Sequence, residues 1–219
     1  MRTTVKLAVA ALCTAILAVP TAHAAGTLAP VQVFEDDTLD SVLLAEATPE
    51  AQDLIAGYIG ETDDALTFTW QVVDIPDGTG GVPEIIHYYW EFTLDVPDDD
   101  KDPQAFSLRA RAYTPEVGRG GGNLQGNCTT TGETLVQCED IPGAEVTVSV
   151  DDIENTITAS VRRQDLKAGD VTVAVDGAVL DEVDLFQGIA TYVGAGLISG
   201  NAADLADMDS PYVLGSPRT

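Results

Sequence analysis

Residues 66–72 read Leu-Thr-Phe-Thr-Trp-Gln-Val, and this stretch decides the fold class. Apolar and polar side chains alternate along it without an exception. That period of two is typical of a half-buried β-strand, because successive side chains of a strand point to opposite faces, whereas a helix repeats every three to four residues. The segment therefore predicts a strand that buries one face. Its buried side chains are expected to be Leu66, Phe68, Trp70 and Val72.

Similar segments lie on both sides of this stretch. Further strands are predicted at residues 54–59, 86–94, 106–112, 146–150, 156–161 and 171–175. The glycine-rich residues 118–126 predict a loop, and residues 179–200 show no clear period. Several short strands with turn residues between them, and no long amphipathic helix, predict an all-β fold. We expect an antiparallel β-sandwich of jelly-roll or immunoglobulin-like type.

The N-terminal residues predict an export signal. A short basic start precedes an apolar run at residues 7–19, which is too short to cross a bilayer, and Ala22-x-Ala24 forms a cleavage signal. We therefore expect residues 1–24 to be a signal peptide and residues 25–219 to form a single secreted, extracellular domain. No second long apolar run follows, so we expect no membrane insertion.

The composition is strongly acidic. The chain holds 36 Asp and Glu residues against 10 Lys and Arg residues, a formal net charge of −26, and loss of Arg2 and Lys6 with the leader brings that charge near −28. Such a charge repels nucleic acid, so we expect no nucleic-acid partner. It also keeps a protein soluble and attracts cations. The 45% apolar content is ordinary for a folded globular protein.

The cysteines predict one disulfide bond. Of the three cysteines, Cys13 lies in the leader, which leaves Cys128 and Cys138 as an even pair in an exported protein. Closing so short a loop is worth roughly 2–3 kcal/mol in the chain-entropy model. His87 is the sole histidine after the leader, which excludes zinc sites built on several histidines.

The first candidate site lies on two neighbouring predicted strands. Their polar residues alternate with the apolar ones, and if the two strands pair, aromatic rings, guanidinium groups and a carboxylate share one exposed surface. Carbohydrate binding uses that mixture, because flat rings stack on sugar C–H faces while fixed polar groups bond hydroxyls. A solvent-facing sheet with cross-strand Glu–Arg pairs is the alternative. The six candidate residues are His87, Tyr89, Glu91, Arg109, Arg111 and Tyr113.

The second candidate site is an acidic segment that could hold Ca²⁺. Asp98, Asp100 and Asp102 stand at alternate positions and could direct several carboxylate oxygens at one ion. No glycine follows where a tight calcium loop needs one, and no glutamate stands at EF-hand distance. A solvated acidic loop is therefore the alternative, and no cofactor other than Ca²⁺ is suggested by these residues.

Catalysis is not the expected activity. A Ser-His-Asp triad would need His87, but the chain has no Gly-x-Ser-x-Gly elbow. Glycoside hydrolysis needs only two carboxylates, and the sequence does not nominate a pair. A carboxylate-based glycoside hydrolase stays an alternative to a binding domain. A second alternative is an acidic structural or interaction protein at the cell exterior, stabilised by Ca²⁺.

Residues 53–74 carry a resemblance to known domains. They combine Ile59, an acidic turn at 61–64 and the alternating strand at 66–72. This pattern resembles the opening strands of secreted sandwich domains of the DOMON type and of family-nine carbohydrate-binding modules. Residues 161–169, a strand followed by a short turn, are similar as well. The resemblance covers about half of the chain and rests on pattern rather than on a diagnostic motif.

The resemblance implies an antiparallel sandwich that binds a sugar or, in some DOMON relatives, haem. Sugar binders of this type clamp the ligand between tryptophans, whereas Trp70 and Trp90 fall on the faces predicted to form the core. Haem-binding relatives use a Met/His pair, for which this chain would offer Met208 and His87. Residues and resemblance together predict a secreted, non-catalytic binding domain whose partner is an extracellular glycan or another cell-surface component.

Overall fold

The structure is a computed structural model of the chain. It describes residues 28–35, 54–75, 84–97, 100–113, 121–131, 134–184, 186–193, 196–205 and 208–215. The predicted signal peptide lies outside the described residues, and so does Asp98 of the predicted calcium site.

The described residues form β-strands and one 3₁₀ turn, Arg163–Asp165, with no α-helix among them. The strands are β1 (Leu28–Glu35), β2 (Leu54–Glu61), β3 (Ala65–Val72), β4 (Glu84–Asp95), β5 (Gln104–Tyr113), β6 (Gly121–Thr131), β7 (Thr134–Asp140), β8 (Val146–Asp151), β9 (Thr156–Arg162), β10 (Lys167–Ala168), β11 (Val171–Thr172), β12 (Val179–Asp184), β13 (Phe186–Val193), β14 (Gly196–Leu205) and β15 (Tyr212–Val213).

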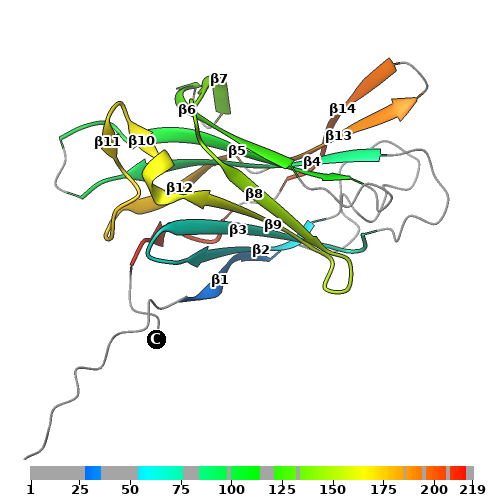
Figure 1. The fold of residues 1–219 in the computed structure, drawn as a ribbon, viewed down its shortest axis with the longest axis horizontal. Coiled ribbons are helices and arrows are strands. Elements are labelled where there is room, and N and C mark those ends of the chain that lie inside the picture. Colours follow the sequence, from blue (N-terminus) through cyan, green and yellow to red (C-terminus); the bar gives the residue numbers. More distant parts are fainter. Residues whose placement is uncertain are drawn as a thin grey trace, which may run out of the picture.

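All of these strands except β10 and β11 belong to two antiparallel sheets that lie one above the other, as Figure 1 shows, whereas β10 and β11 pair with each other in a separate two-stranded sheet. The smaller of the two stacked sheets has the order β1-β2-β3-β9-β8. The larger sheet has the order β14-β13-β4-β5-β6-β7, and β12 joins it by pairing with β4 and with β15. The long strand β4 pairs with β13 over its first half and with β12 over its second half. The fold is an all-β sandwich, as the alternation of side chains predicts.

The core lies between the two sheets and contains the alternate residues that the sequence marks as apolar. Aromatic rings fill its centre: the ring centroid of Phe68 lies 5.1 Å from those of Trp90 and Phe92. Rings of this size bury a large apolar area, so they supply much of the stability of such a core. The fully buried side chains include Leu66, Phe68, Trp70, Val72, Tyr88, Trp90, Phe92, Phe106 and Leu108.

The predicted disulfide is present, but the glycine-rich segment beside it differs from the prediction. Cys128 of β6 is bonded to Cys138 of β7. Residues 121–126 are strand rather than loop. Glycine fits this strand for a steric reason, because a Cβ at Gly122 would lie 2.5 Å from Cγ1 of Val146 on the facing sheet. The strand predicted at 171–175 is also shorter, since only Val171 and Thr172 have strand geometry.

A buried carboxylate fastens the last described segment to the sandwich. Glu61, the final residue of β2, is 2% exposed. Its Oε1 accepts a hydrogen bond from the hydroxyl of Tyr212 at 2.5 Å, and its Oε2 accepts one from the backbone N–H of Gly215 at 3.0 Å. The guanidinium of Arg163, in the 3₁₀ turn, donates to the same Oε2. One carboxylate thus joins β2, the 3₁₀ turn and β15.

Candidate functional site

The polar faces of β4 and β5 form one continuous surface. The two strands pair along their full length, which places His87 opposite Arg111 and Tyr89 opposite Arg109. The intervening Tyr88 is fully buried in the core, so His87 and Tyr89 point away from it, to the outer side of the larger sheet. We call this outer surface of β4, β5 and β6 the outer face.

Two aromatic rings stack at the centre of the outer face. The ring centroids of His87 and Tyr89 lie 6.1 Å apart with an angle of 22° between the planes. The hydroxyl of Tyr89 is 3.4 Å from Nδ1 of His87, within hydrogen-bond distance. The backbone carbonyl of Tyr89 accepts a bond from Nε1 of Trp70 at 3.2 Å, which ties this part of β4 to the core. We call this stacked pair on β4 the platform.

Arg109 is held beside the platform by a hydrogen bond to a neutral amide, which in turn bonds to a carboxylate. Its Nε donates to Oδ1 of Asn123 on β6 at 2.9 Å. The amide of Asn123 in turn donates to Oδ1 of Asp140 on β7 at 3.3 Å, and the amide of Gln125 donates to the same oxygen at 2.9 Å. This chain of bonds holds the guanidinium through a neutral amide, and no carboxylate in the described part of the chain forms an ion pair with Arg109.

Arg111 adds a second positive charge to the same face. Its Nε is buried and has no hydrogen-bond partner. Burial of the imidazole first, and then the charges of Arg109 and Arg111, lower the pKa of His87 from 6.5 to about 4. His87 is therefore uncharged at neutral pH. The platform is a neutral stack of rings beside two guanidinium groups.

Glu91 and Tyr113 stand at the two ends of the predicted set. Glu91 is 9% exposed, and Oε1 accepts a long hydrogen bond of 3.5 Å from the hydroxyl of Ser107, its neighbour on β5. Because it is buried, Glu91 is a supporting group of the outer face rather than an open contact point. Tyr113 ends β5 opposite Ile85, and its side chain lies outside the described residues.

The sequence does not predict three residues that form or support the outer face. Asn123 and Gln125 belong to β6, where the glycine-rich residues 118–126 predict a loop, and Asp140 belongs to β7, for which no strand is predicted. A signal was nevertheless present, because Asn123 and Gln125 flank Leu124, which is 2% exposed. The alternation that identifies the other strands therefore also exists here, over three residues.

The other predicted ligand sites are not assembled among the described side chains. Asp100 and Asp102 are exposed, Asp98 is not described, and no group of three or more His, Cys, Asp or Glu in the described part of the chain is placed to hold a metal ion. Met208 packs against the core, whereas His87 points away from it, so the structure does not bring this pair together. The calcium site stays a prediction.

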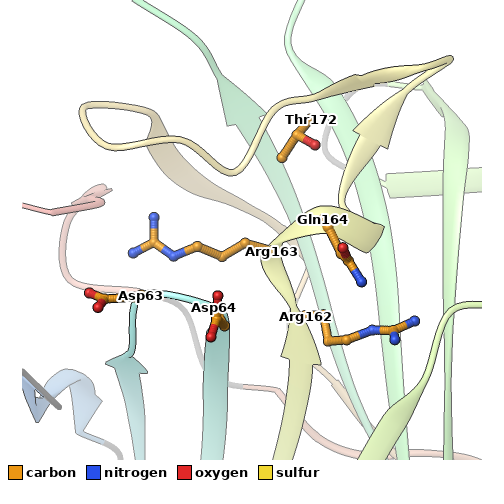
Figure 2. A pocket seen from close by; sticks show the side chains of 6 residues that line it. All are labelled: Asp63, Asp64, Arg162, Arg163, Gln164 and Thr172. Carbon is orange, nitrogen blue, oxygen red and sulfur yellow. The ribbon is translucent and has the colours of Figure 1, made fainter. Parts of the chain in front are cut away.

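A separate pocket of about 400 Å³ opens at one end of the sandwich. Figure 2 shows Asp63 and Asp64 on the turn after β2, and the side chains of Arg162 and Arg163 pointing in opposite directions. Both arginines are engaged by carboxylates of the fold: Arg162 by Asp165 and Glu145, and Arg163 by Glu61 and Asp176. The pocket therefore offers no unpaired arginine to a ligand, and the outer face is the better candidate.

The two tryptophans do not serve a ligand. Trp70 and Trp90 are both fully buried, with ring centroids 5.7 Å apart in the core, so a sugar clamp built on them is excluded. Comparison with protein-family models, curated proteins and solved structures found no match to this chain. The resemblance to DOMON-type and family-nine carbohydrate-binding domains stays a prediction. No described helix is long and apolar enough to span a membrane.

Proposed function

We propose that this protein is an exported, non-catalytic binding domain and that its ligand is an extracellular glycan. The observation that carries the proposal is the stacked pair His87 and Tyr89, set on the outer face beside Arg109 and two side-chain amides. Export is proposed from the leader at residues 1–24.

The chemistry of the outer face suits a sugar ring. A flat aromatic surface covers the C–H face of a pyranose, and hydrogen-bonding groups at its border meet the hydroxyls. Tyr89 supplies the ring together with a hydroxyl. Asn123 and Gln125 supply amide groups whose positions are fixed by Asp140. These groups stand on paired strands, so little conformational entropy is lost when a ligand binds.

A glycan array followed by a polysaccharide pull-down tests the proposal. The protein without residues 1–24 should bind a defined set of glycans, and the double variant Tyr89→Ala, Arg109→Ala should lose that binding. Tyr58→Ala combined with Lys167→Ala is the matched control, since it removes one tyrosine and one cation from other surfaces. Equal binding by the native protein and the outer-face variant, with both variants folded by circular dichroism, would refute the site.

A further inference from the structure

The described arginines use their charge in two different ways. Arg162 and Arg163 each contact two carboxylates of the fold within 3.3 Å. Arg109 and Arg111 lie within 4.0 Å of no carboxylate among the described residues, although the chain holds 36 acidic residues. In a chain this acidic, two arginines without ion pairs on one surface are an unexpected arrangement.

The two unpaired arginines are close to each other and to the platform. They alternate with the buried Ala110 on β5, so both side chains lie on the outer face, opposite Tyr89 and His87 respectively. The Nε of Arg109 donates a hydrogen bond to Asn123, and its two terminal nitrogens have no hydrogen-bond partner among the described residues. The Nε of Arg111 likewise has no acceptor. Both side chains are partly exposed on the outer face.

The lowered pKa of His87 is consistent with its position close to both arginines. Burial lowers its pKa to about 4, and the charges of Arg109 and Arg111 contribute to that shift. Two like charges that are partly buried side by side repel each other, and no carboxylate among the described residues forms an ion pair with either of them. An anion that binds between them would remove this repulsion.

We propose that the outer face binds a polysaccharide that carries carboxylate groups, with the uronate carboxylate held by Arg109 and Arg111 and the sugar ring packed on Tyr89. This inference rests on the proposed function and specifies its ligand class. Guanidinium–carboxylate pairs are short, charge-assisted bonds that often form two at a time, and they fix orientation as well as affinity.

The net charge of the chain adds selectivity. A charge of −26 repels anions at long range, but at physiological ionic strength this repulsion fades over about 8 Å, whereas the guanidinium contacts act at hydrogen-bond distance. Polymers with a charge on every unit, such as nucleic acid or polygalacturonate, meet the full repulsion. A polymer with spaced carboxylates, such as a glucuronate-substituted xylan, can place single groups on the two arginines while the rest of its length carries no charge.

The experiment compares acidic polymers with their own neutral derivatives. Polygalacturonate, alginate and a glucuronate-substituted xylan are each tested beside the same polymer after chemical reduction of its carboxyl groups. Binding is measured by affinity electrophoresis and calorimetry at fixed salt. We expect the native protein to bind at least one acidic polymer about tenfold or more tightly than its reduced form, from the strength of charged hydrogen bonds.

The variants separate the charge contribution from the ring contribution. Arg109→Gln with Arg111→Gln should abolish the preference for the acidic polymer, and Tyr89→Ala should weaken binding to both forms. Equal affinity for the acidic and the reduced polymers would overturn the uronate proposal and leave glycan binding standing. Absence of binding to every polymer and every arrayed glycan would overturn both. The pKa of His87 should rise in the arginine variants, and this shift, read by NMR, verifies that they are folded with the outer face altered.

Discussion

The buried carboxylate of Glu61 gives the sharpest stability test. Glu61→Gln keeps the shape of the side chain and removes its charge. A glutamine has a single acceptor oxygen where the carboxylate offers two to the hydroxyl of Tyr212 and the N–H of Gly215, and Arg163, whose side chain is only 13% exposed, loses its buried counter-charge. Removing one partner of a buried ion pair costs about 3–5 kcal/mol.

The expected loss lies somewhat below that range. Arg163 keeps hydrogen bonds to the carbonyl oxygens of Thr62 and Ala174, and it keeps the exposed carboxylate of Asp176 at 3.0 Å. We therefore expect Glu61→Gln to lower the free energy of unfolding by about 2–4 kcal/mol. For a domain of this size the melting temperature should fall by roughly 5–15 °C.

The assay is urea unfolding and thermal melting at pH 7, with a double-mutant cycle. Asp63→Asn is the matched control, because it makes the same charge change two residues away at an exposed position, and it should stay within about 0.5 kcal/mol of the native protein. Glu61→Gln combined with Arg163→Met should cost less than the two single changes together, by about 1–3 kcal/mol. A Glu61→Gln variant as stable as Asp63→Asn would refute the reasoning.

Three further predictions concern other parts of the sandwich. Replacing Cys128 and Cys138 by alanine should lower the melting temperature by roughly 5–10 °C, since the disulfide closes a short loop. Gly57→Ala should destabilise by about 1–3 kcal/mol in urea, because its Cβ would lie 1.8 Å from the ring of Phe34. His87 should titrate by NMR near pH 4. As the pH falls from 6.5 to 4, the unfolded chain binds a proton at His87 before the folded protein does, so the free energy of unfolding decreases. His87→Gln should remove this part of the decrease.

The strands that the sequence predicts best are those with one fully buried face. In β3 every second residue contacts the core, so the alternation is complete over residues 65–72. β6 lacks this pattern, because a Cβ at Gly122 would lie 2.5 Å from Cγ1 of Val146 and a Cβ at Gly126 would make a tight contact of 3.0 Å with Cδ1 of Ile141. A glycine-rich composition predicts a loop for such a strand, although its glycines are there because neighbouring side chains pack closely against it.

The candidate site could be predicted in part for the same reason. His87, Tyr89, Arg109 and Arg111 follow from alternation within two strands that are neighbours in sequence. The hydrogen bond from Arg109 to Asn123 depends on the register of β5 against β6, and the hydrogen bond from Tyr212 to Glu61 joins residues that are 151 positions apart. Contacts of that kind arise from strand pairing across the whole chain, which local patterns do not encode.

The distribution of arginines links the fold to the proposed ligand. Arg162 and Arg163 each pair with two carboxylates of the fold: Arg162 with Asp165 and Glu145, and Arg163 with the buried Glu61 and the exposed Asp176. A chain with 36 acidic residues could pair Arg109 and Arg111 in the same way, but within the described residues neither forms an ion pair, and Arg109 contacts the neutral Asn123 instead. A carboxylate beside Arg109 would stabilise the free protein more than the neutral amide of Asn123 does. The neutral amide therefore costs stability but leaves the charge of Arg109 available for binding. Stability is expected to be lower in this way when the ligand supplies the carboxylate.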